Sequence, residues 1–234
     1  MRFKRGEYSE AVVPVGEGDV MCAVMDNRSL VIVTKTRKME VLILDLKSLE
    51  EATLEVEATL LSDEIISAID MNEKVIVTVT DIGQGTLWNR KNREIITRFN
   101  SDMYVAGVKI TEDSIVTLSH SCVSVLSYND SQGSVVMGGK IEGEDYSSIR
   151  MDADGDNLLV VLKNHLRLYD MRDRSSLRIQ TDVQVEGIIY QCKLFFPYAA
   201  VTTSHRTPQL QVWNMERGQH LRTIKNNGFV LRRI

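Results

Sequence analysis

Asp152 opens a run of alternating aspartates, the pattern with which calcium-binding loops begin. The three carboxylates belong to Asp152, Asp154 and Asp156. A calcium loop needs glycine at its sixth position and a bidentate glutamate at its twelfth, and this sequence has Asn157 and Lys163 there. Asp154-Gly155 is instead typical of a tight turn between two strands. The segment therefore predicts a solvated hairpin turn, and we expect no metal site in it.

Three histidines in predicted turns are the other candidate metal ligands. They are His120, His165 and His205. Zinc holds its nitrogen ligands about 2 Å away, and histidines that lie in separate repeats are too far apart for that geometry. Ser119 and Ser204 precede two of these histidines but do not form a nucleophile and base with them, because adjacent strand side chains point to opposite sides. We therefore expect these three histidines to lie in surface turns and to bind no metal.

Motifs of known catalytic or cofactor sites are missing from the sequence. There is no Gly-x-Ser-x-Gly, no phosphate-binding glycine loop, no Cys-x-x-Cys and no helical His-x-x-x-His. The sequence therefore predicts that the protein is not an enzyme and that it has no catalytic residues, cofactor or metal.

Charge is the remaining patterned signal, because basic side chains recur in the turns between second and third strands. These residues are Lys35, Arg37, Lys38, Lys163, His165, His205 and Arg206. Arginine and lysine bind carboxylates and phosphates, so these residues are the candidate partner-binding surface for acidic or phosphorylated protein segments. Acidic residues such as Glu57 and Glu144 lie in the connections into each new unit, and a mixed solvated surface is the interpretation that we favour over a dedicated anion site.

The composition indicates one soluble globular domain, since 43% of the 234 residues are hydrophobic and 26% are charged. The net charge of -4 gives no general reason to expect nucleic-acid binding. No apolar run is long enough for a secretory signal or a membrane span, so we expect no membrane attachment. Cys22, Cys122 and Cys192 are widely spaced in apolar surroundings, which is typical of buried thiols in a reducing compartment. Cytoplasm or nucleus is the expected location.

The elements that carry these turns are copies of one extended unit, clearest at Leu210-Gln211-Val212-Trp213-Asn214. Leu210 and Val212 point to one side of the strand and Trp213 to the other, so the strand must be covered on both faces. Asn214 then ends the strand, because a short amide side chain bonds its own backbone and starts a turn. Four further copies end at bulky residues 44, 88, 126 and 169, so the copies recur every 38 to 44 residues. Such a period, with several strands in each repeat, is typical of a β-propeller blade.

We therefore predict an all-β fold, a β-propeller of about five four-stranded antiparallel blades in a ring that is either closed or incomplete. A lead-in over 1–15, with a lone strand at 11–15, precedes the propeller over 16–234. The units are 16–60, 61–101, 102–143, 144–185 and 186–226, with a partial strand over 227–234. Unpaired edge strands at an open end favour self-association. Residues 46–61 fit either an outer strand, which the alternation at 54–58 favours, or an amphipathic helix.

The first strand of each unit would line the centre of a propeller. A propeller enzyme would need a cluster of acidic residues or histidines there. The predicted strands Val20–Val24, Ile65–Ile69 and Ser148–Met151 are mostly apolar, which disfavours an enzyme with a central site.

Residue pairs at the end of the third strands resemble the dipeptide that names the WD repeats. The pairs are Leu44-Asp45, Trp88-Asn89, Tyr169-Asp170 and Trp213-Asn214. The resemblance covers about residues 20–234 and implies a propeller that binds other proteins. No Gly-His dipeptide opens a unit, and the usual aspartate before each third strand is missing, so the family's structural hydrogen-bond network is absent or rebuilt.

Phe3-Lys4-Arg5-Gly6-Glu7 resembles the Trp-x-x-Gly stretch that joins an F-box to the propeller in F-box/WD-repeat proteins. This resemblance implies the substrate-recognition part of a ubiquitin ligase. We therefore expect a non-enzymatic protein-protein interaction scaffold. A propeller-fold enzyme with a channel site and a structural fragment of a larger multi-blade protein are the alternatives.

Overall fold

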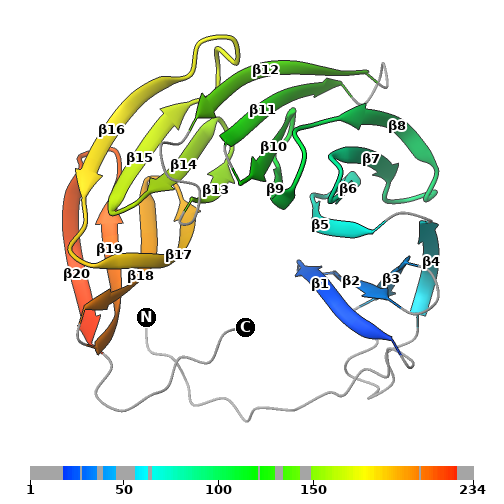
Figure 1. The fold of residues 1–234 in the computed structure, drawn as a ribbon, viewed down its shortest axis with the longest axis horizontal. Coiled ribbons are helices and arrows are strands. Elements are labelled where there is room, and N and C mark those ends of the chain that lie inside the picture. The colour runs from blue at the N-terminus through cyan, green and yellow to red at the C-terminus, as the bar shows by residue number, and fades with distance from the viewer. Residues whose placement is uncertain are drawn as a thin grey trace. The chain divides into compact units, whose positions relative to one another are not determined.

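The computed structural model describes nine stretches of the chain, and all their regular structure is β-strand. These are residues 18–26, 28–35, 39–45, 56–62, 65–120, 122–129, 134–142, 149–205 and 207–225. Within them, five four-stranded antiparallel sheets form, with their strands paired in sequence order, which is the predicted all-β β-propeller fold (Figure 1). Nowhere in these stretches is a helix long and apolar enough to cross a membrane. The chain divides into two compact units, residues 1–66 and 67–234, which are described separately.

The first unit holds one sheet. Its strands are β1 (Asp19–Met25), β2 (Ser29–Lys35), β3 (Met39–Asp45) and β4 (Val56–Ser62). Asp26 makes the first turn, because its carboxylate accepts the backbone N–H groups of Arg28 and Ser29 at 2.8 Å. The described part of 46–61 is the strand β4, as the alternation favoured. Residues 46–55 and the lone strand predicted at 11–15 lie outside the described residues.

The second unit holds four sheets of four consecutive strands. The second sheet contains β5 (Ile66–Met71), β6 (Val75–Thr80), β7 (Gln84–Asn89) and β8 (Ile95–Asn100). The third contains β9 (Val105–Ile110), β10 (Ser114–Ser119), β11 (Cys122–Asn129) and β12 (Ser134–Glu142). The fourth contains β13 (Arg150–Asp154), β14 (Asn157–Leu162), β15 (His165–Asp170) and β16 (Arg178–Gln184). The fifth contains β17 (Ile188–Phe195), β18 (Tyr198–His205), β19 (Thr207–Asn214) and β20 (Gln219–Lys225).

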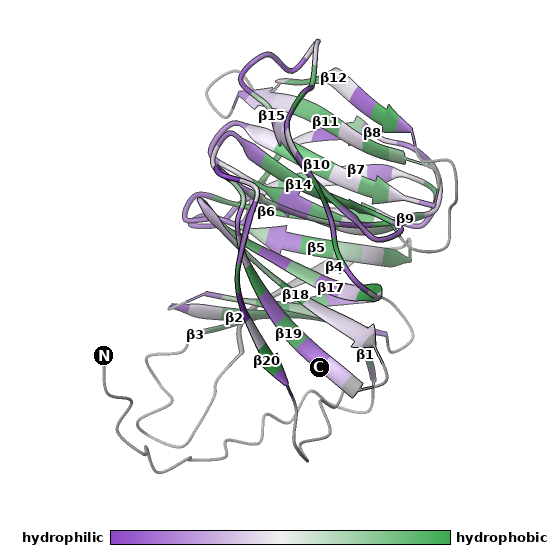
Figure 2. Ribbon diagram, turned by 90° about the vertical axis from the view of Figure 1, so that its left-hand side faces the viewer, coloured by the Kyte–Doolittle hydropathy of each residue, from purple (hydrophilic) through white to green (hydrophobic). Residues whose placement is uncertain are grey.

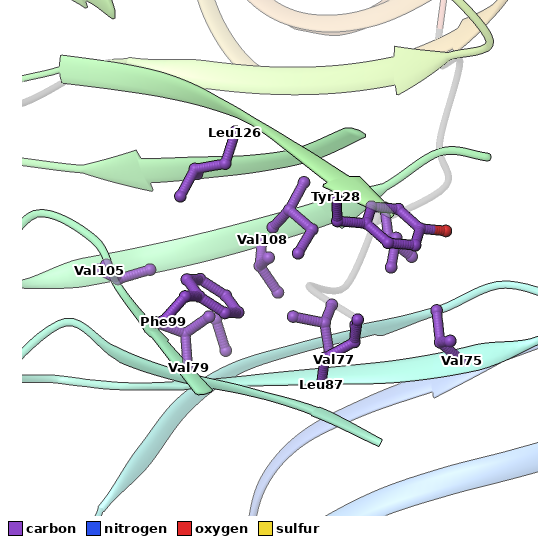
Figure 3. Close-up of a cluster of buried hydrophobic side chains, with 12 residues drawn as sticks. Val75, Val77, Val79, Leu87, Phe99, Val105, Val108, Leu126 and Tyr128 are labelled. Atoms are coloured by element: carbon purple, nitrogen blue, oxygen red, sulfur yellow. The ribbon is translucent and has the colours of Figure 1, made fainter. Parts of the chain in front are cut away.

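Neighbouring sheets of the second unit pack face to face through aliphatic side chains. Between the second and third sheets, Val77, Val79 and Leu87 share one cluster with Val108 and Leu126 (Figure 3). Full burial of such a side chain contributes about 1.5–3 kcal/mol relative to its exposure. Hydrophobic stretches alternate with hydrophilic ones along these strands (Figure 2). The fourth and fifth sheets pack in the same way through Leu159, Val161, Leu168, Ile189, Leu194 and Val201.

The bulky residue near the end of the third strand is tied to the second strand by hydrogen bonds. In the second sheet, Trp88 Nε1 donates to Thr78 Oγ1 at 3.1 Å. In the fifth sheet, Trp213 Nε1 donates to Gln211 Oε1 at 3.3 Å, and Gln211 Nε2 donates to Thr203 Oγ1 at 3.4 Å. These hydrogen bonds join the second and third strands of the two sheets.

The turn after β13 is the solvated hairpin that the sequence predicts. Asp154 pairs with Asn157 across it, and Gly155 has a φ of 55°. Asp154 and Asp156 are exposed, whereas Asp152 is buried on β13. The turn therefore connects β13 to β14. Asp152 lies in a buried environment, whereas Asp154 and Asp156 face solvent.

Candidate interaction surface

The predicted basic set is only partly described by the structure. Lys35 is exposed at the end of β2 in the first unit. Lys163 is exposed in the turn between β14 and β15 of the second unit, and His165 begins β15. The described part of the chain leaves out Arg37, Lys38 and Arg206, together with the side chain of His205. Convergence of the set on one face therefore stays a prediction.

His165 shares a carboxylate with a neighbouring arginine. His165 Nδ1 lies 2.8 Å from Asp182 Oδ1, and Arg167 Nε donates to Asp182 Oδ2 at 2.8 Å. Partial burial would raise the pKa of Asp182, but the hydrogen bonds from His165 and Arg167 outweigh it and lower that pKa. Lys163 is therefore the exposed cation at this turn.

Large apolar side chains gather on two loops of the second unit that the sequence analysis did not single out. Ile82, in the turn between β6 and β7, is 48% exposed. Met103 and Tyr104, in the connection between β8 and β9, are 57% and 61% exposed. We call these three residues the apolar platform. Exposed apolar side chains on loops that are bonded to each other are a candidate interaction site.

The backbone holds the two loops of the apolar platform together. Gly83 O accepts the N–H of Ser101 at 2.8 Å, and Asp81 O accepts the N–H of Tyr104 at 2.7 Å. Ile82 lies between these two bonded carbonyls. Gly83 has a φ of 85°, and a Cβ there would come within 2.4 Å of Asp102 O. Only glycine fits this close approach.

Side chains fix the same connection to the third sheet. Ser124 Oγ donates to Asp102 Oδ2 at 2.5 Å, and Lys140 Nζ pairs with Asp102 Oδ1 at 3.0 Å. The hydroxyls of Ser101 and Thr117 share a hydrogen bond of 2.7 Å. Burial would raise the pKa of Asp102, but hydrogen bonds from Ser124, Lys140 and the Cys122 thiol outweigh it and lower that pKa. The connection between β8 and β9 is therefore bonded both to the turn after β6 and to the third sheet.

Tyr104 adopts a backbone conformation that L-residues rarely use, with a φ of 60°. The left-handed region costs roughly 1–2 kcal/mol for a residue with a Cβ, and such strain is concentrated at functional sites. The Tyr104 ring stacks on His120, with ring centres 6.0 Å apart and an interplanar angle of 26°. The loop thus holds a large apolar side chain in an exposed, fixed position.

The first strands of the four sheets in the second unit carry charges of alternating sign. Asp70 lies on β5, Lys109 on β9, Asp152 on β13 and Lys193 on β17. Lys109 Nζ is 3.5 Å from Asp70 Oδ1 and 3.8 Å from Asp152 Oδ1, and Lys193 Nζ is 3.2 Å from Asp152 Oδ2. We call these four residues the inner charge chain.

Each aspartate of the inner charge chain also accepts a backbone N–H from the next first strand. Ile110 N donates to Asp70 at 2.9 Å, and Leu194 N donates to Asp152 at 2.7 Å. Burial raises the pKa of Asp70, although the positive charge of Lys109 acts to lower it. Both carboxylates are therefore engaged in ion pairs and hydrogen bonds that join neighbouring sheets.

The prediction that the first strands are mostly apolar thus missed the charged residues on the first strands of the second unit. The predicted strands ended at Ile69 and Met151, one residue before Asp70 and Asp152. Strand boundaries are the least certain part of a pattern-based prediction, and here the error hid two buried carboxylates. The described residues contain no group of three or more His, Cys, Asp or Glu side chains that could hold a metal ion.

The apolar platform could have been found from one signal in the sequence. Connections between strands are usually polar, yet Asp81-Ile82-Gly83 and Asp102-Met103-Tyr104 place large apolar residues in such segments. Spacing alone does not show that these two segments are neighbours. Their contact depends on tertiary structure, namely the bonded pairs at Gly83 and Tyr104.

Comparisons with known proteins show the fold of the chain but no family. No protein-family model and no curated protein sequence matches it. Among solved structures, Kluyveromyces lactis Hsv2 is 12% identical with a TM-score of 0.70, and the match covers 89% of this chain and 64% of that one. A functionally unknown protein from Desulfotomaculum acetoxidans is 13% identical with a TM-score of 0.71, over 90% of this chain and 71% of that one.

A computationally designed protein, Ika8, is 11% identical with a TM-score of 0.61, and the match covers 92% of this chain and 63% of Ika8. The chain thus spans about two thirds of the length of these structures. Likeness at such low identity concerns the path of the backbone, and function depends on the side chains at a site.

Proposed function

We propose that the chain is a non-enzymatic protein-protein interaction scaffold whose contact surface is the apolar platform. The observation that carries this proposal is the exposure of Ile82, Met103 and Tyr104 on loops that are fixed from both sides. Binding sites are commonly built on loops that a rigid scaffold positions. The propeller fold is consistent with this role.

The energetics support a binding role for the apolar platform. Burial of a large apolar side chain contributes about 1.5–3 kcal/mol, and interface energy is concentrated in a few such residues near the centre of a contact. A loop that is already ordered loses little conformational entropy when a partner binds. The backbone bonds to Asp81 and Gly83 provide that order before binding.

The resemblance to F-box/WD-repeat proteins motivates a finer proposal, the substrate-recognition part of a ubiquitin ligase in the cytoplasm or nucleus. In that role the partners are other proteins, including acidic or phosphorylated segments, and no nucleic acid or membrane is involved. Basic residues such as Lys163 would then contact the acidic partner. Co-purification of ubiquitin-ligase subunits with the tagged full-length protein tests this finer role.

One structural feature bears on the alternative of an enzyme with a channel site. This feature is the pair of buried aspartates in the inner charge chain. Asp70 and Asp152 each face a lysine and accept a backbone N–H. A general acid or base must reach the substrate proton, and these groups already have partners. We therefore favour a scaffold.

Charge substitution on the apolar platform tests the proposed contact surface. In the double variant Ile82→Asp with Met103→Asp, two carboxylates replace apolar contacts, so recovery of bound partners should fall at least tenfold. Val136→Asp is the matched control, because Val136 is 61% exposed on β12. Quantitative mass spectrometry of co-purified proteins should show partners lost from the double variant and retained by the control. Equal recovery by all three proteins, each confirmed as folded, would reject the apolar platform.

A further inference from the structure

A thiol and an amine are neighbours inside the third sheet. The sulfur of Cys122 on β11 and the ammonium of Lys140 on β12 interact through a side-chain hydrogen bond. The pairing of the two strands explains this contact, because Ser124 lies directly opposite Lys140. Cys122 comes two residues before Ser124 and shares its face of β11. Side chains on diagonal positions of paired strands are within reach of a long side chain such as lysine.

Asp102 anchors the lysine in this position. Its Oδ1 lies 3.0 Å from Lys140 Nζ, and its Oδ2 accepts a hydrogen bond from Ser124 Oγ at 2.5 Å. The Cys122 thiol also forms a hydrogen bond with the Asp102 carboxylate. One carboxylate therefore binds both the side chain that carries the sulfur and the side chain that carries the nitrogen.

Two serine hydroxyls fix the sulfur itself. Ser119 Oγ lies 3.1 Å from Cys122 Sγ and accepts the backbone N–H of Cys122 at 3.2 Å. Ser124 Oγ lies 3.8 Å from the same sulfur. The thiol thus lies in a polar cluster made by Ser119, Ser124, Asp102 and Lys140, although Cys122 is 1% exposed.

The other two cysteines are poorer candidates for oxidation. Burial raises the pKa of Cys22 to about 11 and that of Cys192 to about 12, so both stay protonated at neutral pH. The thiolate is the form that reacts with oxidants, and cysteines that react commonly have a cationic neighbour. Cys122 has such a neighbour in the ammonium of Lys140, to which it is hydrogen-bonded.

The oxidant for this thiol must be a small molecule, because the sulfur is buried. Hydrogen peroxide is only slightly larger than water. The two side chains in contact with the sulfur, Asp102 and Lys140, are partly exposed, and rotation of the long lysine side chain is enough to admit peroxide. Oxidation of Cys122 therefore needs no open binding surface.

We propose that Cys122 and Lys140 form an oxidative crosslink, in which a sulfur–nitrogen bond joins β11 to β12. Hydrogen peroxide oxidises the thiol to a sulfenic acid and is itself reduced to water. The neutral amine of Lys140 then attacks the sulfur, the S–O bond breaks, and the hydroxyl group leaves as water with a proton from the amine. One peroxide molecule takes up the two electrons, and the product has two hydrogen atoms fewer than the reduced chain.

The lysine must lose a proton before it attacks. The hydrogen bond to Asp102 and the interaction with the Cys122 sulfur raise the pKa of Lys140, so the ammonium predominates at neutral pH. Its proton goes to water. Mildly alkaline solution, which supplies more of the neutral amine, is therefore the condition for the test.

The crosslink changes the anchor of the connection between β8 and β9. The nitrogen of a sulfenamide is uncharged, so Asp102 keeps its hydrogen bond from Ser124 and loses its cationic partner. The modification site itself is defined by contacts within the third sheet and the connection before it. It does not depend on partner binding at the apolar platform.

Peroxide treatment of the purified full chain tests the proposal. The chain is first reduced and then treated with hydrogen peroxide at mildly alkaline pH. Mass spectrometry of a protease digest should show a linked pair of peptides, one with Cys122 and one with Lys140. The mass of the pair should be two hydrogen atoms below the sum of the separate peptides. Dithiothreitol should release the two peptides, because a thiol attacks the sulfur of the link.

Lys140→Arg separates the chemistry from the fold. Arginine keeps a positive charge next to Asp102, but its guanidinium stays protonated and does not attack sulfur. The linked pair should therefore be absent from this variant. Lys91→Arg is the matched control, because Lys91 is an exposed lysine in the turn after β7. It should give as much of the linked pair as the wild type does.

Three results would each overturn the proposal. These are the absence of the linked pair from the oxidised wild type, a link from Cys122 mainly to another lysine or to a cysteine, and an equal yield of linked Cys122 peptide in Lys140→Arg. The wild-type digest decides the question by itself, so the test does not depend on how the variants fold. Failure of the apolar platform to bind a partner would leave these results unchanged.

Discussion

The backbone N–H of Tyr104 donates to the carbonyl of Asp81 at 2.7 Å, which joins the connection after β8 to the turn after β6. This bond keeps Tyr104 at a φ of 60° with its ring exposed. A residue in this backbone region persists only when its surroundings compensate for its cost. Here the compensation comes from the bonds at Ser101 and from the anchored carboxylate of Asp102.

Gly83→Ala should destabilise the protein by at least about 2 kcal/mol, because it adds left-handed strain and a backbone clash with Asp102. Gly155→Ala is the matched control, since Gly155 also has a positive φ but has no atom within 4 Å of the added Cβ. The control should cost only about 1 kcal/mol. Chemical denaturation measures both values. Equal losses would show that the close approach at Gly83 contributes nothing.

Asp152→Ala should lower the free energy of unfolding by about 1–3 kcal/mol, because it leaves the buried N–H of Leu194 without its acceptor. The side chain of Asp152 is 2% exposed. Asp182→Ala removes a carboxylate whose side chain is 35% exposed, and it should cost only about 0–1 kcal/mol. Urea denaturation of the two variants side by side makes the comparison. A loss below 1 kcal/mol for Asp152→Ala would contradict the stabilising role of the inner charge chain.

The Asp102 interactions should make stability depend on pH in the acid range. The pKa of Asp102 is lowered in the folded protein, so its contribution is complete above the unfolded value of about 3.9 and is lost as pH falls through the folded value. The stability difference between the wild type and Asp102→Asn should therefore be larger at pH 7 than at pH 3. Denaturation curves at both pH values measure it. A difference that stays the same at both would rule out the charged form as the stabilising one.

The repeat in the sequence predicted the fold well, because both-face burial and turn residues recur at each third strand. The strands β7, β11, β15 and β19 all end near the bulky residues that define the period. The functional surfaces were not predicted in the same way. Asp70 and Lys109 are 39 positions apart, and pairing across sheets depends on the twist and stacking of the blades. Likewise, only the folded backbone shows that Ile82 and Tyr104 are neighbours.

Self-association through open blade edges stays a prediction, motivated by the five repeats of the sequence. Sedimentation velocity over a range of protein concentrations should show a sedimentation coefficient that rises with concentration, because edge strands carry unpaired backbone groups. Protease cleavage is expected near 229–234, in a part of the chain outside the described residues. A single monomeric species that resists protease throughout would indicate a closed ring.

Site-specific photocrosslinking tests the contact surface most directly. A photoreactive residue placed at Met103 should yield a covalent adduct with a partner protein in cells, and excess unlabelled wild-type chain should suppress it. The same residue at Val136, which is equally exposed but lies on β12, should yield no such adduct. Our account predicts an adduct at Met103 that disappears when Ile82→Asp is added. Adducts at Val136 with none at Met103 would contradict the proposal that the apolar platform is the surface through which this propeller binds its partners.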